Sequence, residues 1–111
     1  MTYLAVTLRD AQHICWKNFR KINDNLEPER GERWTLFVTV TDLLEEAGEV
    51  ASAVKALEDP RSTEKSGTKE TLAKDLSNML YTIFVLAEHY HIELEERLLQ
   101  TVNDYILRFI R

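Results

Sequence analysis

Two short acidic clusters, each inside an apolar helical pattern, contain the side chains best suited to chemistry in this sequence. Glu45, Glu46 and Glu49 form the first cluster, and Asp75 and Asn78 form the second. Charged side chains within an apolar pattern lower stability unless a partner compensates for them. Clustered carboxylate and amide oxygens, without histidine or cysteine, are the ligands that Mg²⁺ and Mn²⁺ prefer. The sequence therefore predicts a divalent-cation site built by two helical segments.

Long helices are expected to position these clusters. The 111 residues include only three glycines and two prolines, and long segments follow the helical period, which indicates an all-α fold. We expect helices over about 7–22, 34–57, 68–90 and 93–109. The segment 23–31 is an expected loop because it is rich in turn-forming residues. The polar segment 61–67 is a second expected loop, because Asp59-Pro60 should stop the helix before it.

Helical geometry places each acidic cluster on one side of its helix. At about 100° per residue, four carboxylates of the second helix fall within an arc of roughly 100°: Asp42, Glu45, Glu46 and Glu49. One stripe of the third helix contains Asp75, Asn78 and Thr82. If the two helices pair antiparallel, these stripes face each other, and divalent cations would convert the repulsion between carboxylates into coordination. A plain solvated helix face is the alternative interpretation.

The two central helices are apolar over much of their circumference. A first stripe on helix 34–57 is expected to be its packed seam: Leu36, Val40, Leu43, Ala47, Val50, Val54 and Leu57. A second stripe beside it contains Phe37, Leu44 and Ala51. The same breadth in helix 68–90 is typical of a helix at the centre of a bundle or a dimer interface. Tyr105, Ile106 and Phe109 are expected to pack the last helix onto the bundle.

We therefore expect one domain over 1–111, a four-helix bundle-like fold built on an antiparallel hairpin and completed as a homodimer or homotetramer. A net charge of -5 argues against nucleic-acid or anionic-membrane partners. The longest apolar run, 79–87, is too short to span a bilayer. Cys15 is the only cysteine, and together with the lack of a signal-peptide pattern it favours a cytoplasmic protein.

Two other patterns in the sequence could indicate a metal site or a nucleophile, but simpler interpretations fit them better. Glu88 and His91 have the Glu-x-x-His spacing of carboxylate-bridged di-iron bundles. Those sites need the motif on two helices and a carboxylate from each of two others, and this chain contains one copy at a helix end. Cys15 is expected to be a small buried apolar residue rather than a nucleophile.

The two clusters resemble the signature of the MazG-like all-α nucleoside triphosphate pyrophosphohydrolases. That signature is Glu-Glu-x-x-Glu on one helix and Glu-x-x-Asp on the next. Residues 45–49 read Glu-Glu-Ala-Gly-Glu and match the first half fully. Asp75 and Asn78 stand where the second half has glutamate and aspartate. The resemblance covers most of the chain, is strongest over 34–98, and implies a single MazG-like domain over 1–111.

The resemblance also implies an activity, namely hydrolysis of a nucleoside or deoxynucleoside triphosphate between the α and β phosphates, which yields monophosphate and pyrophosphate. The implied cofactor is Mg²⁺, with Mn²⁺ as a possible substitute. Glu45, Glu46 and Glu49 are the expected catalytic carboxylates, with Glu45 as an outer ligand or the base that orients water. The implied metal ligands are Glu46, Glu49, Asp75 and Asn78.

Substrate contacts are expected from the flat and basic side chains around the acidic clusters. Trp34, or else Trp16, could stack on the base, although a packing role is the plainer interpretation of both. Lys65, Lys69 or Arg61 could approach the leaving pyrophosphate, or the two lysines could simply be solvated. Family members often carry a lysine and an asparagine on the last helix, where this chain offers Asn103 or Arg108 instead.

These departures support an alternative function. Asn78 offers an oxygen but no charge, and the last helix contains no matching lysine. The alternative is a non-enzymatic relative, a helical dimer that binds a nucleotide or a partner protein without cleaving it.

Overall fold

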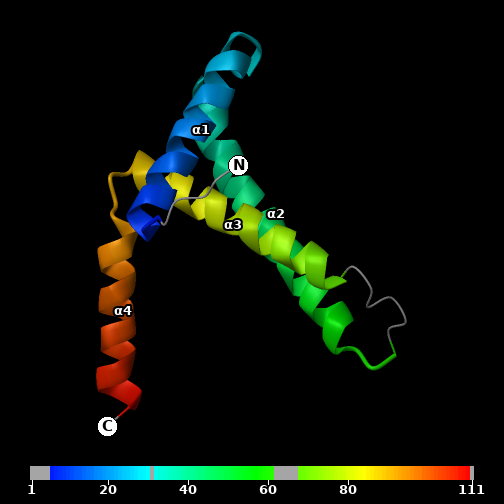
Figure 1. Cartoon of the computed structure of the whole chain (residues 1–111). Helices are drawn as coiled ribbons and strands as arrows, with labels where there is room; N and C mark the ends of the chain where they lie inside the picture. Colours follow the sequence, from blue (N-terminus) through cyan, green and yellow to red (C-terminus); the bar gives the residue numbers. More distant parts are fainter. Residues whose placement is uncertain (1–5, 31, 62–67, 111) are drawn as a thin grey trace.

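The computed structural model describes residues 6–30, 32–61 and 68–110, with the backbone alone described for 25–30, 32–36 and Thr68. These residues form four α-helices and contain no strand, which confirms the predicted all-α class. The helices are α1 (Leu8–Arg30), α2 (Glu32–Glu58), α3 (Thr68–His89) and α4 (Leu94–Phe109) (Figure 1). Gly31 and most of the second predicted loop lie outside the described residues.

Helix α1 continues past its predicted end at residue 22 and reaches Arg30. The prediction of a loop over 23–31 is therefore wrong for residues 23–30. Asparagine and aspartate lower helix stability by at most about 0.7 kcal/mol per residue relative to alanine, so a few of them do not end a helix. Pro28 lies in the last turn of α1, where its missing amide removes one intrahelical hydrogen bond.

The other helix ends agree with the predictions to within about two residues. Helix α2 ends at Glu58, directly before the predicted Asp59-Pro60 stop. The Asp59 carboxylate then accepts a hydrogen bond of 2.9 Å from the backbone amide of Arg61, and this closes a turn of the kind that aspartate favours. The amide of Arg61 is the main reason that the pKa of Asp59 is lowered.

Helices α2 and α3 pair antiparallel and make the most extensive contact in the fold, which confirms the predicted hairpin (Figure 1). Helix α1 packs across α3. The buried apolar side chains of the described residues are few, and they lie on the two hairpin helices: Ala53, Phe84, Val85 and Ala87. A core of this size is small for a chain of 111 residues.

The hairpin has two unlike faces, one on each side of the α2–α3 seam. Thr39 and Ala53 are buried and mark the side of α2 that faces its neighbours. At about 100° per residue, the carboxylates of α2 lie to one side of these residues and its exposed apolar side chains to the other. The acidic face consists of Asp42, Glu45, Glu46, Glu49, Asp75, Asn78 and Thr82. The apolar face consists of Phe37, Val40, Leu44, Val54, Leu76 and Leu80.

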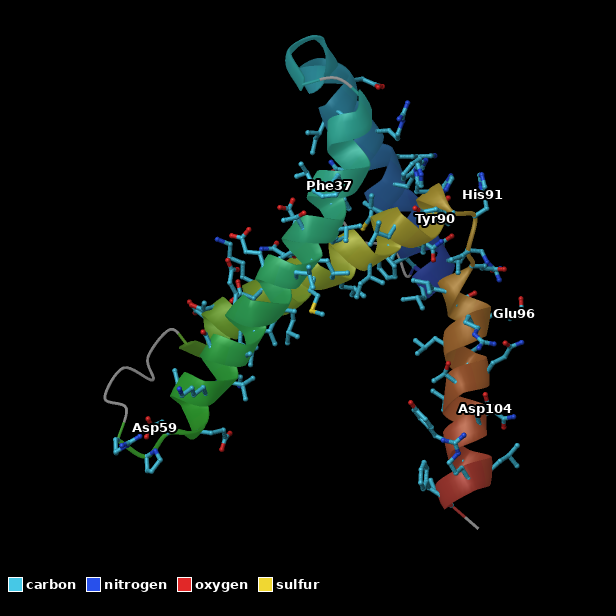
Figure 2. The ribbon with its side chains drawn as sticks, turned by 180° about the vertical axis from the view of Figure 1, so that it is seen from behind. Phe37, Asp59, Tyr90, His91, Glu96 and Asp104 are labelled. Atoms are coloured by element: carbon cyan, nitrogen blue, oxygen red, sulfur yellow. The ribbon has the colours of Figure 1, made fainter. Side chains whose placement is uncertain are left out.

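The side of α2 that is buried differs from the packed seam that the sequence predicted. Val40 and Val54 were expected inside it but are 45% and 43% exposed. Phe37 and Leu44 of the neighbouring stripe are 78% and 72% exposed, and Phe37 projects from the outer side of α2 (Figure 2). In the single chain, α2 therefore turns Thr39 and Ala53 inward and leaves much of its apolar surface exposed to solvent.

Helix α4 extends away from the hairpin as a separate arm (Figure 1). It has no buried residues, and its main contact is with α1. Tyr105, Ile106 and Phe109 are 56%, 43% and 72% exposed. The prediction that these three residues pack the last helix onto the bundle is therefore wrong for the single chain.

A polar cluster at the base of α4, which we call the α4 joint, holds this arm in place. The Gln12 side chain is buried, with 4% exposure. Its amide nitrogen donates to the Ile92 carbonyl and to Glu88, each at 2.8 Å, and its oxygen accepts from the Leu94 amide at 3.2 Å. Arg9 forms ion pairs with Glu93 and Glu95. The direction of α4 is thus fixed by hydrogen bonds that α1 supplies.

The turn between α3 and α4 is a Schellman motif. The Ile92 amide donates to the Ala87 carbonyl at 2.8 Å, and the His91 amide donates to the Glu88 carbonyl at 3.1 Å. His91 lies in the turn (Figure 2) and has a φ of 58°. This left-handed conformation strains side-chain-bearing residues, so glycine is the usual choice at this position.

Replacing His91 with glycine is therefore expected to stabilise the protein by about 1 kcal/mol. The thermal midpoint should rise by roughly 4 °C. The comparison variant is His89→Gly, at the last residue of α3, which should destabilise the protein because glycine lowers helix stability and the ring contacts of His89 with Trp16 and Tyr90 are lost. Thermal melts of both variants followed by circular dichroism check the prediction. A lower midpoint for His91→Gly would contradict the turn geometry.

Candidate functional site

The acidic face of the hairpin contains a groove between α2 and α3. Its cavity is about 550 Å³ and is lined by Glu45, Glu49 and Asp75 together with Thr71 and small side chains. The small residues keep the groove open: a Cβ added at Gly48 would meet no atom within 4 Å. Glu45 and Glu49 of α2 thus share one groove with Asp75 of α3, as the antiparallel pairing required.

Two carboxyl groups meet across this groove. Asp75 is 6% exposed, and its carboxyl lies close enough to that of Glu49 for the two groups to interact. The pKa of the Glu49 carboxyl is raised by desolvation first, and then by the charges of Asp75 and Glu45. Two carboxylates in contact repel each other, and this repulsion is relieved when one of them takes up a proton or when the two share a cation. This pair is therefore suited to share a cation.

Glu46 lies deeper in the seam and has one unpaired oxygen. Its Oε1 atom accepts a hydrogen bond of 2.9 Å from the Thr82 hydroxyl. Its Oε2 atom is buried and has no hydrogen-bond partner. A buried carboxylate oxygen without a donor is costly, so this atom is suited to contact a positive or donating group. The Thr82 hydroxyl also lies 3.1 Å from the backbone carbonyl oxygen of Asn78. Thr82 therefore contacts both Glu46 and the second acidic cluster.

A second cavity, about 320 Å³, adjoins Glu46 and Asn78. Phe19 and Ile22 of α1, with Tyr81 and Val85 of α3, form its apolar wall, and Thr39, Asp42, Glu46, Asn78 and Thr82 form its polar side. The Tyr81 hydroxyl donates to the Asn18 amide oxygen at 2.6 Å, which fixes the ring in the wall. Sequence reasoning missed this wall, because only the packing angle of α1 brings Phe19 and Ile22 to the acidic face.

The oxygen atoms of the candidate ligands are chemically suited to a hard cation such as Mg²⁺. All candidate ligands are oxygens, and Mg²⁺ binds through one or two carboxylates while water and phosphate complete its shell. Within the described ranges, no group of three or more His, Cys, Asp or Glu side chains is arranged to hold a metal ion. The structure instead brings Glu49 next to Asp75 and places Glu46 and Asn78 in the lining of one cavity. The unpaired Glu46 oxygen and the contact between two carboxyls are the observations that fit a bound cation.

Of the predicted substrate contacts, Lys69 and Asn103 do not line the groove in the single chain. Lys65 and the Trp34 side chain lie outside the described residues. Lys69 is exposed in the first turn of α3. Asn103 is exposed on α4, which extends away from the hairpin.

The surroundings of Trp16 and Cys15 indicate packing roles for both residues. The Trp16 ring stacks on Phe19 with centroids 6.1 Å apart, and the Arg20 guanidinium lies 5.9 Å from its centre. Burial raises the pKa of the Cys15 thiol, which favours the unreactive thiol form. Both surroundings agree with the packing interpretation of these residues.

No family model and no solved structure matches the chain significantly. A curated relative is the "Uncharacterized protein YvdC" of Bacillus subtilis (strain 168), which is 33% identical over 66 residues. The matched region covers 54% of this chain and 62% of that protein, so the chain spans less than two thirds of the relative's length. Among the described helices, none is long and apolar enough to cross a membrane.

Proposed function

We propose that this chain is a MazG-like, Mg²⁺-dependent pyrophosphohydrolase of nucleoside or deoxynucleoside triphosphates. The observation that supports this most is the acidic groove: Asp75 meets Glu49 from the opposite helix, and Glu46 keeps a buried oxygen without a partner. A reaction on a polyphosphate needs oxygen ligands that share a cation with phosphate groups, and this groove supplies such ligands.

In this proposal, Glu46, Glu49, Asp75 and Asn78 hold Mg²⁺, or Mn²⁺ in its place. The cation, when bound, neutralises phosphate charge and makes water more acidic. Glu45 lines the groove beside Glu49 and takes the proton of the attacking water. The new bond forms between water oxygen and phosphorus, the bridge between the α and β phosphates breaks, and pyrophosphate leaves.

The second cavity is the proposed place for the base of the substrate. Its aromatic residues, Phe19 and Tyr81, offer flat surfaces on which any base can stack. Trp34, Lys65, Lys69 and Asn103 remain proposed substrate contacts. Asn103 reaches a groove of this kind only if α4 of another copy brings it there. The proposal includes a homodimer or homotetramer in the cytoplasm, with no nucleic-acid or membrane partner.

Pyrophosphate release from a panel of ribo- and deoxynucleoside triphosphates tests the proposal. Each substrate is offered with Mg²⁺, with Mn²⁺ and with a chelator. Metal-dependent release from one or a few nucleotides is the expected result. No release from any nucleotide by a folded protein would favour the alternative, a helical dimer that binds a nucleotide or protein without cleaving it. Asn78 motivates that alternative, because it brings no charge to the groove.

Restoring the charge with Asn78→Asp separates the two functions. If the chain is an enzyme, the added carboxylate should lower the Mg²⁺ concentration for half-maximal turnover by about tenfold. Changes around metal ligands alter metal affinity by about this factor. If the chain only binds, the same change should raise turnover from none. Ser77→Asp, at the adjacent exposed position, is the matched control and should leave the metal dependence unchanged. Titration of turnover against Mg²⁺ measures both.

A further inference from the structure

The second cavity, about 320 Å³, contains a carboxylate that the proposed reaction does not use, that of Asp42 on α2. Phe19, Tyr81 and Val85 form part of its apolar wall. Val85 is 2% exposed, and the Tyr81 ring is fixed by the hydrogen bond from its hydroxyl to Asn18. A flat ring that enters the cavity therefore meets a preformed apolar surface, and the polar lining is left for its edge.

Asp42 lies on the same side of α2 as the carboxylates of the groove. At about 100° and 1.5 Å per residue, Glu46 is one turn further along the helix, roughly 6 Å in the direction of its axis, and Glu49 is two turns further, roughly 10 Å. Asp42 and Glu46 both line the second cavity, whereas Glu49 and Asp75 line the groove. A nucleotide whose phosphates lie at the groove can therefore bring its base to Asp42.

A carboxylate at this position discriminates between bases by the donors on their edges. Asp42 is exposed, so a ligand can reach it, and an ionised carboxylate only accepts hydrogen bonds. Among the common bases, guanine alone presents two adjacent N–H donors on its Watson–Crick edge, N1–H and the 2-amino group, which match the two carboxylate oxygens. Adenine and cytosine present an amino group beside an acceptor nitrogen. Uracil and thymine present one N–H between two carbonyl oxygens, which a carboxylate repels.

We propose that Asp42 selects the base and that this chain prefers guanine nucleotides. The Asp42 carboxylate accepts from N1–H and from the 2-amino group of guanine while the ring lies against the apolar wall. Hydrogen bonds to a charged acceptor are stronger than neutral ones, and an apolar surrounding strengthens them further. This inference rests on the proposed function for the place of the base. It concerns recognition, however, and holds whether or not the bound nucleotide is cleaved.

Binding of nucleotide analogues that resist cleavage tests the base preference. In these analogues a methylene group replaces the oxygen between the α and β phosphates, and isothermal titration calorimetry with Mg²⁺ measures their dissociation constants. The GTP analogue should bind at least about tenfold tighter than the ITP analogue, which lacks only the 2-amino group, because one hydrogen bond to a charged group is lost. The ATP, CTP and UTP analogues should also bind more weakly than the GTP analogue. Equal binding of the GTP and ITP analogues would overturn the proposal.

Asp42→Asn then tests the residue itself. Asparagine keeps one acceptor oxygen and adds an N–H donor, which fits xanthine, because xanthine has a carbonyl oxygen where guanine has the 2-amino group. The variant should bind the GTP analogue at least about tenfold more weakly and the XTP analogue more tightly than the unmodified chain does. Asp24→Asn is the matched control, since Asp24 is exposed on α1 and does not line the cavity. A guanine preference that survives Asp42→Asn would overturn the role of Asp42.

These results also separate the base preference from the proposed reaction. A guanine preference that Asp42→Asn shifts to xanthine supports the inference even if no nucleotide releases pyrophosphate. Pyrophosphate release from all nucleotides alike, with equal binding of the analogues, supports the reaction and overturns the inference. If Asp42→Asn instead raises the Mg²⁺ concentration needed for binding and leaves the order of the bases unchanged, Asp42 serves the cation and the inference is overturned. Failure of a folded chain to bind any analogue contradicts both proposals.

Discussion

Replacing Glu49 with glutamine is expected to reduce pyrophosphate release by at least about 100-fold while the fold survives. Glu49 is exposed enough for glutamine to fit, but the change removes one of the two carboxylates that meet across the groove. In chelator, the variant should melt at the same temperature as the unmodified chain or higher, because the charge repulsion between Glu49 and Asp75 is gone. After desolvation, this repulsion is the next cause of the raised pKa of Glu49. The rise in thermal midpoint that we expect Mg²⁺ to cause in the unmodified chain should be absent in the variant.

The two readouts for Glu49→Gln separate lost chemistry from lost folding. Glu58→Gln is the matched control, since Glu58 is an exposed carboxylate on the same helix but lies outside the groove. It should keep both turnover and the stabilisation by Mg²⁺. Turnover of Glu49→Gln at the unmodified rate would refute the assignment of the groove as the reaction site. A midpoint that falls in chelator would mean that Glu49 has a structural role instead.

The second large effect is expected at the α4 joint. Gln12→Leu keeps the size of the side chain but removes three hydrogen bonds and leaves the Ile92 carbonyl and the Leu94 amide without their partner. Each unsatisfied buried group costs about 1–3 kcal/mol, and these hydrogen bonds are partly buried, so we expect a loss of about 2–3 kcal/mol. The thermal midpoint should fall by roughly 10 °C. Urea unfolding, followed by circular dichroism, measures the free energy directly.

The control for Gln12→Leu is Gln100→Leu, the same replacement at an exposed position of α4. A surface change of this kind should alter stability by no more than about 0.5 kcal/mol. If the two variants proved equally stable, the hydrogen bonds of Gln12 would not be what holds α4. If Gln12→Leu alone is destabilised, the amides of Ile92 and Leu94 should also exchange their hydrogens faster, because the joint opens before the hairpin.

Periodicity made the hairpin and its acidic groove predictable. The spacing of Glu45 and Glu49 and the position of Asp75 on the next helix need only helix geometry and an antiparallel turn, and both follow from local sequence. The wall of the second cavity could not be predicted, because Phe19 reaches it only through the angle at which α1 crosses α3. The proposed substrate contacts could not be located either, since Lys69 and Asn103 are both exposed in the single chain.

The outward position of α4 was missed for a related reason. An amphipathic helix such as α4 shows in the sequence that one side will be covered, but not by which chain. The direction of the arm is set by Gln12, whose side chain is buried although glutamine is usually exposed. A polar residue in an amphipathic pattern carries no sign of such a role. The same holds for α1, where the extension to Arg30 overrides weak turn preferences.

The two-faced hairpin also limits how the sequence can change in length. Inserting or deleting one residue in α2 between Val40 and Glu49 would rotate everything beyond it by about 100°. Glu49 would then turn out of the groove while apolar side chains turned toward it, so one event would damage both faces at once. Point substitutions act on one face at a time. We therefore expect natural variation in length to fall outside the paired segments, while the two faces change independently by substitution.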